Sequence, residues 1–355
     1  MKKKVLILQT GIYNYRVAIF NQLANYYDLS VTYAEKDDSP EDALYKRIRI
    51  KESHIGPFRF HKIRSLCKQY DVVVYMPSLH RISFWSIPLL PHRYKTVSLA
   101  IGMRASYTRR LDINRAMTFL DKLFGLSQFK ADAVLVYFKE VLAFWKPKEI
   151  ILKKCFQTRN TTDVLYYSNK ELNKDSILFI GTLYKEKRVD SLILSYKEVF
   201  DKYPNSIPNL EIIGSGNQVE ELKSLVSQLG LDNKVFMRGA IYDEKTLSAY
   251  FLKSIVSVSP NQAGLSVPKS MGYGVPFVTI KDAITGGEIF HIKDGVNGLI
   301  LNSLDWLPSL IEDVVLNKDK YIQMGINARQ YYEKEANINT MVGGFRDAIE
   351  YALNS

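Results

Sequence analysis

The segment FIGTLYKEKRVDSLI (179–193) places three basic side chains shortly after a glycine. Its apolar start predicts a strand that ends at Gly181, and Lys185, Lys187 and Arg188 precede an expected helix. A cation that projects from the carboxyl end of a strand can stabilise the negative charge that grows on a diphosphate leaving group. A charge run is also typical of a solvated helix start, so that interpretation stays open beside the catalytic one.

A second segment, SPNQAGLSVPKSMGYGVPFVT (259–279), has the pattern of a strand end, a tight loop, a short helix and a new strand. Asn261 lies before the loop and Lys269 lies one turn into the helix, so both could face the same bound ligand. A short helix that only packs against the core is the alternative. The N–H groups that could hold a phosphate at the start of this helix are those of Gly264, Leu265 and Ser266.

Three further glycine junctions could bring backbone close to a ligand. Each is also explained by an ordinary strand-to-helix connection or by an acidic charge at a helix start. The junctions are LQTGIYNYRVAIF (8–20) with Gly11 and Arg16, IIGSGNQVEEL (212–222) with Gly214 and Gly216, and ITGGEIF (284–290) with Glu288.

Other chemistries find little support in the sequence. There is no Asp-x-Asp pair to seat a metal–diphosphate complex, and the five histidines show no ligand spacing with cysteines or acidic residues. No Gly-x-Ser-x-Gly nucleophile elbow is present. We therefore expect neither a bound metal nor a serine nucleophile.

Composition is that of a soluble globular protein, with 46% hydrophobic and 24% charged residues in a chain of 355. The two cysteines are far apart and fit a reducing compartment. The start MKKKVLILQTG predicts a first buried strand, since its apolar run is too short for an export signal. No run is long enough for a membrane span; FWSIPLL (84–90), the nearest, is interrupted by Pro88.

The charge is divided unevenly along the chain. Residues 1–170 carry 29 Lys and Arg against 14 Asp and Glu, whereas 171–355 carry 19 against 23, although the whole chain has a net charge of +11. This asymmetry predicts an anionic partner for the first half, and a solvated basic face is the alternative. No basic helix with interleaved aromatics is seen, so nucleic acid is not expected.

Short apolar strands alternate with helical patterns throughout, which predicts an α/β chain of parallel βαβ units. The series ends near 160, and a polar stretch over 166–175 is the expected linker before it restarts at Ser176. We expect a first domain over 1–165 and a second over 176–335. Residues 336–355 form a helix that either ends the second domain or crosses back to the first.

Taken in order, the motifs from 179 to 300 resemble the donor domain of family 4 glycosyltransferases. The resemblance is specific over about 176–305 and general over 1–160. Lys187 falls on the catalytic lysine of that family, while Thr182 stands where an arginine is usual. Asn261 and Lys269 stand at the two ends of its Glu-x7-Glu motif, in place of both glutamates.

The resemblance implies the GT-B fold, in which two Rossmann-like domains face each other across a cleft. It implies a retaining, metal-independent transferase without a cofactor, which moves a hexosyl or N-acetylhexosaminyl group from a nucleoside diphosphate sugar, with UDP favoured. Lys187 and Asn261 would be catalytic. The donor would be bound by Gly11, Arg16, Gly181, Thr182, Gly214, Gly216, Arg238, Gly264, Leu265, Ser266, Lys269 and Glu288.

The implied acceptor is a glycan, expected to be lipid-linked, in polysaccharide or lipopolysaccharide biosynthesis. The basic first domain would then rest on an anionic membrane surface, with FWSIPLL as a contact, and the protein would be cytoplasmic and peripheral at the inner face of the cell membrane. Two alternatives stay open. One is a nucleotide-sugar epimerase of the same fold, and the other is a noncatalytic nucleotide-sugar-binding partner, which the missing glutamates motivate.

Overall fold

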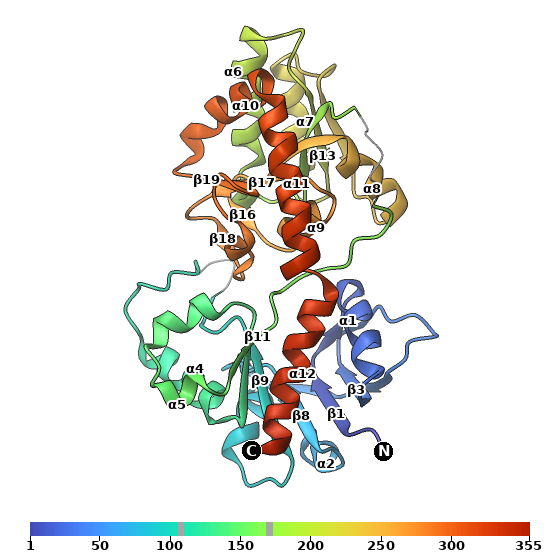
Figure 1. Cartoon of the computed structure of the whole chain (residues 1–355), viewed down its shortest axis with the longest axis vertical. Helices are drawn as coiled ribbons and strands as arrows, with labels where there is room; N and C mark the ends of the chain where they lie inside the picture. The colour runs from blue at the N-terminus through green and yellow to red at the C-terminus, as the bar shows by residue number, and fades with distance from the viewer. Residues whose placement is uncertain (106–109, 168–172) are drawn as a thin grey trace. The chain divides into compact units, whose positions relative to one another are not determined.

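The computed structural model describes residues 1–105, 110–167 and 173–355. These residues form two compact units (Figure 1). The first contains 1–105, 111–162 and 338–355, and the second contains Arg110 and the described part of 163–337. The expected linker falls in part on 168–172, which lie outside the described residues.

The first unit is built on a seven-stranded sheet in which all neighbouring strands are parallel. Its central strands β1 (Lys4–Leu8) and β8 (Val72–Tyr75) are buried almost throughout, as expected for apolar strands covered on both faces. The order is β11-β10-β9-β8-β1-β3-β5, with β3 (Asp28–Tyr33), β5 (Lys46–Arg49), β9 (Lys95–Ala100), β10 (Ala133–Val136) and β11 (Cys155–Gln157).

Helices and two small strand pairs complete the first unit. The pairs are parallel β2 (Gly11–Ile12) with β4 (Lys36–Asp37), and antiparallel β6 (Glu52–Ile55) with β7 (Phe58–His61). The helices are α1 (Asn14–Ala24), α2 (Arg64–Cys67), α3 (Ile82–Trp85), α4 (Phe119–Lys130), α5 (Glu149–Leu152) and α12 (Ile338–Asn354), with 3₁₀ turns η1 (Ile87–Leu89) and η2 (Lys139–Trp145).

The C-terminal helix α12 belongs to this first unit, although it follows the second unit in the chain. It packs against α1 and the strands β9, β10 and β11 (Figure 1). Met341, Phe345 and Ile349 are buried, and their helical spacing is the one the sequence predicts. A Cβ atom at Gly344 would lie 2.1 Å from the carbonyl oxygen of Gln157, so the helix approaches the sheet as closely as a glycine allows.

The second unit has a six-stranded, all-parallel sheet of order β14-β13-β12-β15-β17-β19. The strands are β12 (Ser176–Ile180), β13 (Asn209–Ile213), β14 (Val235–Gly239), β15 (Ser254–Val258), β17 (Phe277–Ile280) and β19 (Gly298–Leu301), beside the small parallel pair β16 (Gln262–Ala263) and β18 (Ile284–Thr285). The helices are α6 (Val189–Lys202), α7 (Val219–Gln228), α8 (Glu244–Lys253), α9 (Ser266–Gly272), α10 (Leu307–Leu316) and α11 (Lys318–Glu335), with 3₁₀ turns η3 (Lys185–Lys187), η4 (Glu288–His291) and η5 (Leu304–Trp306).

Each sheet has one point where its strand order reverses. In the first unit the chain goes from β1 to β3 on one side and later to β8 on the other. In the second unit it goes from β12 to β13 on one side and later to β15 on the other. Ligands of open α/β sheets bind beyond the carboxyl ends of the strands at such switch points. The loops after β1 and β8, and those after β12 and β15, are therefore the places to search for sites.

Helix α4 begins at Phe119 because Thr118 caps it: the Thr118 hydroxyl accepts from the Asp121 amide, and the Asp121 carboxylate accepts from the Thr118 amide at 2.9 Å. The FWSIPLL segment is not an exposed surface, since Phe84, Ile87 and Pro88 are buried and only Leu90 is exposed. In the described part of the chain, no helix is long and apolar enough to span a membrane.

Candidate functional site

The loop after β12 brings Lys187 to the switch point of the second sheet. Lys187 is only 8% exposed, and among the described residues it has no ion-pair partner. Desolvation lowers the pKa of its ammonium group to about 8. Its Nζ lies close to Gly181, because a Cβ atom built there would be 3.1 Å from it. Gly181 thus leaves room beside an ammonium group that lacks a counter-charge.

Asn261, after β15, is bonded to the same loop. Its Nδ2 donates to the carbonyl oxygen of Glu186 at 2.9 Å, while its buried Oδ1 has no hydrogen-bond partner in the described part of the chain. The neighbouring Gln262 accepts from the Tyr184 hydroxyl at 2.8 Å. The switch-point loops are therefore held together by side chains, and one amide oxygen is left to accept from a ligand.

Gly214 and Gly216 lie where the loop after β13 meets the loop after β12. A Cβ atom at Gly214 would be 1.9 Å from the carbonyl oxygen of Gly181, and one at Gly216 would be 2.1 Å from that of Leu183. Leu183 also donates its amide to Ser215 at 2.8 Å. These glycines let two loops touch, which is a reason for glycine that the sequence pattern did not reveal. Their contact with a nucleotide stays a prediction.

Lys269 lies on α9 and is paired with a carboxylate that the sequence analysis did not single out. Its Nζ lies 2.5 and 2.6 Å from the two carboxylate oxygens of Glu244, at the start of α8. The charge of Lys269 is therefore neutralised within the protein. Gly264 and Leu265 precede α9, which begins at Ser266 and has seven residues; their role at a phosphate stays a prediction.

Glu288 is buried at the start of η4 and turns back on its own loop. It accepts from the Gly286 amide at 2.9 Å and lies 3.3 Å from the Thr285 hydroxyl. This loop is tied to the Asn261 segment, because the Ile284 amide donates to the Asn261 carbonyl at 3.0 Å. The structure therefore connects two of the predicted donor-binding segments, those of Asn261 and Glu288.

The remaining predicted residues have other surroundings. Arg238, on the edge strand β14, forms a bidentate ion pair with Glu211 at 2.7 and 3.0 Å, and Thr182 is exposed. Gly11 and Arg16 belong to the first unit, where Arg16 is buried and donates to the Tyr137 hydroxyl and to Asn160. No group of three or more His, Cys, Asp or Glu side chains within 1–105, 110–167 and 173–355 is arranged to hold a metal.

The second unit also matches a known family. Residues 167–331 match the family model described as glycosyl transferases group 1. This match covers the Lys187 loop, Asn261, α9 and Glu288. It agrees with the resemblance to glycosyltransferases in the sequence, at the coarser level of group 1.

Curated relatives are similar over part of their length. An uncharacterized glycosyltransferase of Haemophilus influenzae is 25% identical over 202 residues, which are 54% of this chain and 55% of the relative. An uncharacterized glycosyltransferase of Methanocaldococcus jannaschii is 25% identical over 261 residues, which are 68% of this chain and 64% of the relative. The D-inositol 3-phosphate glycosyltransferase of Corynebacterium jeikeium is 28% identical over 166 residues, which are 44% of this chain and 39% of the relative. The chain thus spans less than two thirds of each of these relatives.

Solved structures show the fold. HepE from Anabaena in complex with UDP has a TM-score of 0.71 at 15% identity, with 98% of this chain and 99% of that chain covered. A mutant of TarM from S. aureus, solved in complex with Fondaparinux, alpha-GlcNAc-glycerol and UDP, has a TM-score of 0.69 at 12% identity, with 98% of this chain and 99% of that chain covered. The sucrose-phosphate synthase of Thermosynechococcus elongatus has a TM-score of 0.70 at 14% identity, with 98% of both chains covered. The predicted α/β GT-B fold, with two Rossmann-like units built on parallel sheets, is confirmed.

Proposed function

We propose that this chain is a glycosyltransferase that moves a hexosyl or N-acetylhexosaminyl group from a nucleoside diphosphate sugar to a hydroxyl group of a glycan. UDP is the favoured nucleotide, and the transfer retains the anomeric configuration and needs no metal. The group 1 match and the UDP complexes of HepE and TarM support the reaction class and the nucleotide. Retention and metal independence rest on the sequence resemblance and on the missing Asp-x-Asp pair.

The observation that carries this proposal is the buried ammonium group of Lys187. A buried charge without a partner is costly, and the cost is relieved when a ligand of opposite charge binds. A diphosphate beside Gly181 would supply that charge, and it would raise the pKa of Lys187 from its low value near 8. The site is thus suited to an anion before any donor arrives.

The same geometry serves the chemistry. As the bond between the anomeric carbon and the diphosphate oxygen breaks, Lys187 stabilises the charge that develops on the leaving group. The acceptor oxygen forms the new bond to that carbon, and its proton passes to the departing phosphate, so no protein nucleophile is needed. Asn261 Oδ1 is placed to accept from a donor-sugar hydroxyl, since its Nδ2 is fixed by Glu186.

Calorimetry with UDP, GDP and ADP on the full chain tests the proposal. We expect heat of binding with UDP, and a loss of affinity of about tenfold or more in Lys187→Met. Lys185→Met is the matched control, because Lys185 is exposed two residues away. A folded protein that binds none of the three nucleotides, or a Lys187→Met variant that binds as the parent does, would overturn it.

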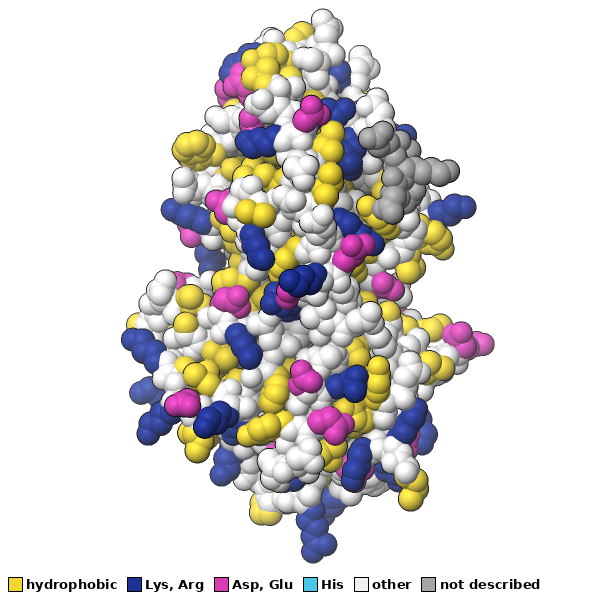
Figure 2. All heavy atoms as spheres, in the orientation of Figure 1, with side chains coloured by type: hydrophobic (Ala, Val, Ile, Leu, Met, Phe, Trp, Pro, Cys, Tyr) yellow, Lys and Arg dark blue, Asp and Glu magenta, His cyan; other side chains and the backbone are white. Residues whose placement is uncertain are grey.

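The proposal extends to a lipid-linked acceptor at an anionic membrane surface, in cell-surface polysaccharide or lipopolysaccharide synthesis at the inner face of the cell membrane. Helix α4 offers a surface for it in place of FWSIPLL. Phe119 is 72% and Leu126 50% exposed, and Lys122 and Lys130 are exposed beside them. Figure 2 shows basic and hydrophobic side chains together over the part of the first unit that holds α4 and α5. Such a face suits the boundary between lipid headgroups and acyl chains.

Vesicle sedimentation separates this extension from the transferase proposal. We expect the chain to bind vesicles rich in phosphatidylglycerol more than neutral ones, with less binding at high salt. The double variant Phe119→Ser with Leu126→Ser should bind less, and Leu194→Ser with Leu316→Ser is the matched control, since these leucines are exposed on the second unit. Equal binding to both vesicle types, or equal loss in both double variants, would remove the membrane surface and leave nucleotide binding untouched.

A noncatalytic nucleotide-sugar-binding partner is the second candidate. The ion pair of Lys269 with Glu244 favours it, because Lys269 stands where the resemblance to family 4 implies a glutamate and its charge is already neutralised by Glu244. Incubating the chain with UDP-sugars, with and without glycan acceptors, distinguishes a transferase, an epimerase and a noncatalytic binding protein. Release of UDP only with an acceptor indicates transfer, isomerised donor without an acceptor indicates an epimerase, and binding without turnover indicates the noncatalytic protein.

A further inference from the structure

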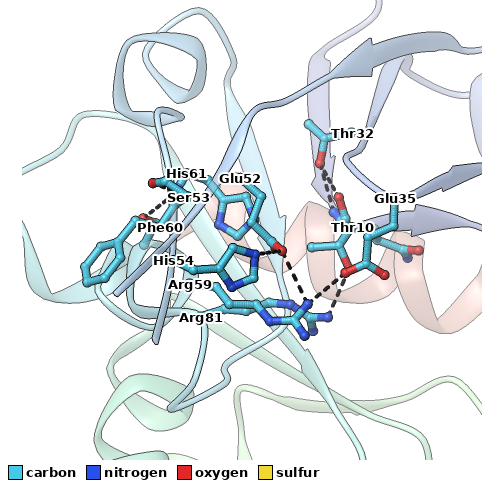
Figure 3. Close-up of polar contacts among 12 residues, drawn as sticks. Thr10, Thr32, Glu35, Glu52, Ser53, His54, Arg59, Phe60, His61 and Arg81 are labelled. Carbon is cyan, nitrogen blue, oxygen red and sulfur yellow. Dashed lines mark hydrogen bonds and ion pairs between the residues drawn. The ribbon is translucent and has the colours of Figure 1, made fainter. Parts of the chain in front are cut away.

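Polar side chains gather at the switch point of the first sheet (Figure 3). Thr10 follows β1, and Arg81 follows β8 at the start of α3. The Arg81 Nη2 donates to the Thr10 hydroxyl at 3.0 Å. The Thr10 carbonyl accepts from the amides of Ala34 and Glu35, both at 2.9 Å, after β3. Three loops at the carboxyl edge of the sheet are therefore fixed to one another where α/β sheets bind their ligands.

The hairpin of β6 and β7 adds a second arginine to this edge. The Arg59 amide donates to the His80 carbonyl at 2.7 Å, and Arg59 and Arg81 form an isolated parallel bridge. Figure 3 shows both guanidinium groups directed toward Thr10 and Glu35. Arg59 and Arg81 thus lie next to each other at the carboxyl edge of the first sheet. Which of them has a carboxylate partner decides whether this site can bind an anion.

Arg59 forms ion pairs with both nearby carboxylates, those of Glu35 and Glu52. Its Nη1 lies 2.8 Å from Glu35 Oε1 and 3.4 Å from Glu52 Oε1. Glu52 is also bonded to His61 Nε2 at 2.9 Å and lies 3.0 Å from His54 Nε2. Glu35 and Glu52 are therefore already engaged, both by the Arg59 guanidinium and Glu52 also by the rings of His61 and His54.

Arg81 has no such partner. No carboxylate forms an ion pair with it in the described part of the chain, and its buried Nε lacks a hydrogen-bond acceptor there. Its guanidinium has donors to spare, since Thr10 uses Nη2 only. This pattern, a cation at a switch point without a counter-ion, is the one that Lys187 shows in the second unit.

We propose that this place is the acceptor subsite and that it selects an acceptor bearing an anionic group, a carboxylate or a phosphate, beside its hydroxyls. Arg81 binds the anion, because a guanidinium matches the paired oxygens of both groups. Glu35, 44% exposed at its side chain, accepts from neighbouring hydroxyls. The excess of Lys and Arg over residues 1–170 attracts such a molecule. The word acceptor rests on the proposed transferase function, whereas anion binding at Arg81 does not.

Ligand-observed saturation-transfer NMR on the full chain tests this subsite with three probes: methyl glucuronide, glucose phosphate and methyl glucoside. We expect one or both charged probes to bind and the neutral one to bind at least about tenfold more weakly. The charged probe that binds identifies the source of the anion. Equal binding of all three probes, or binding of none, would overturn the proposal.

Variants separate binding from structure. Arg81→Gln should lose the charged probe, Arg81→Lys should keep part of the affinity, and exposed Arg93→Gln should behave as the parent. Thr10→Val removes the hydroxyl that Arg81 bonds but keeps the cation, so it should keep most of the binding. If Thr10→Val loses as much as Arg81→Gln, Arg81 has only a structural role and the proposal fails. UDP binding measured on the same samples reports on the second unit, so failure there is seen separately.

Discussion

The carboxyl edges of the two sheets use the same topology and different electrostatics. In both, the loops on either side of the switch point are joined by a side chain: Arg81 to Thr10 in the first unit, and Asn261 to Glu186 in the second. The first edge has two cations: Arg59 is paired with the carboxylates of Glu35 and Glu52, whereas Arg81 beside it has no ion pair in the described part of the chain. The second edge buries Lys187 without a paired carboxylate among the described residues. The difference indicates that the second unit binds a compact anion, whereas the first unit binds a molecule that carries hydroxyl groups beside an anionic group.

The tight loop contact under Lys187 gives the largest expected effect. Gly214→Ala puts a methyl group 1.9 Å from the Gly181 carbonyl oxygen, so the loop must move. We expect a loss of about 2–4 kcal/mol in the free energy of unfolding, together with weaker UDP binding. Denaturant titration and calorimetry measure the two. Gly264→Ala has open space around its new Cβ and should leave the stability nearly unchanged. An equal loss of stability in the two variants would show that the contact of Gly214 with Gly181 does not cause the effect.

The pKa of Lys187 predicts how the second edge depends on pH. Because burial lowers this pKa to about 8 from an ordinary 10.5, the folded state releases the proton first as the pH rises. The parent should therefore gain stability over Lys187→Met between about pH 8 and 10.5, by at most about 1.4 kcal/mol per pH unit. Its UDP affinity should fall above pH 8 by at most about tenfold per unit. Parallel pH profiles for the parent and Lys187→Met would contradict this, while the first edge, tested with the charged acceptor probes, should show no such step at pH 8.

The ion pair of Lys269 and Glu244 gives the smallest effect. Both side chains are partly accessible, at 14% and 34%, so we expect Glu244→Gln to cost about 0.5–1.5 kcal/mol. The exchanged pair, Lys269→Glu with Glu244→Lys, should recover part of that loss, as a double-mutant cycle would measure. A change in UDP affinity without a change in stability would instead place Lys269 in contact with the nucleotide.

The sequence predicted what depends on local pattern. The parallel strands were recognisable because they are short apolar runs, and Lys187 because it follows a strand and a glycine. It did not predict the partner of Lys269, since Glu244 lies 25 residues away on another helix. It also did not predict the group around Arg81, because its members come from the hairpin of β6 and β7 and from the loops after β1, β3 and β8, which only the folded chain brings together. Glycines 214 and 216 were noticed, but their reason is a contact between two loops that only the folded chain creates.

The return of α12 to the first unit has a consequence for biosynthesis. The strands β9 to β11 are complete by residue 157, yet the helix that covers them begins at residue 338. While the ribosome makes the intervening stretch, that apolar face of the nascent protein has no cover and is open to chaperones. The first unit is therefore completed only at the end of synthesis, and a stop codon before residue 338 would leave this face of its sheet without α12.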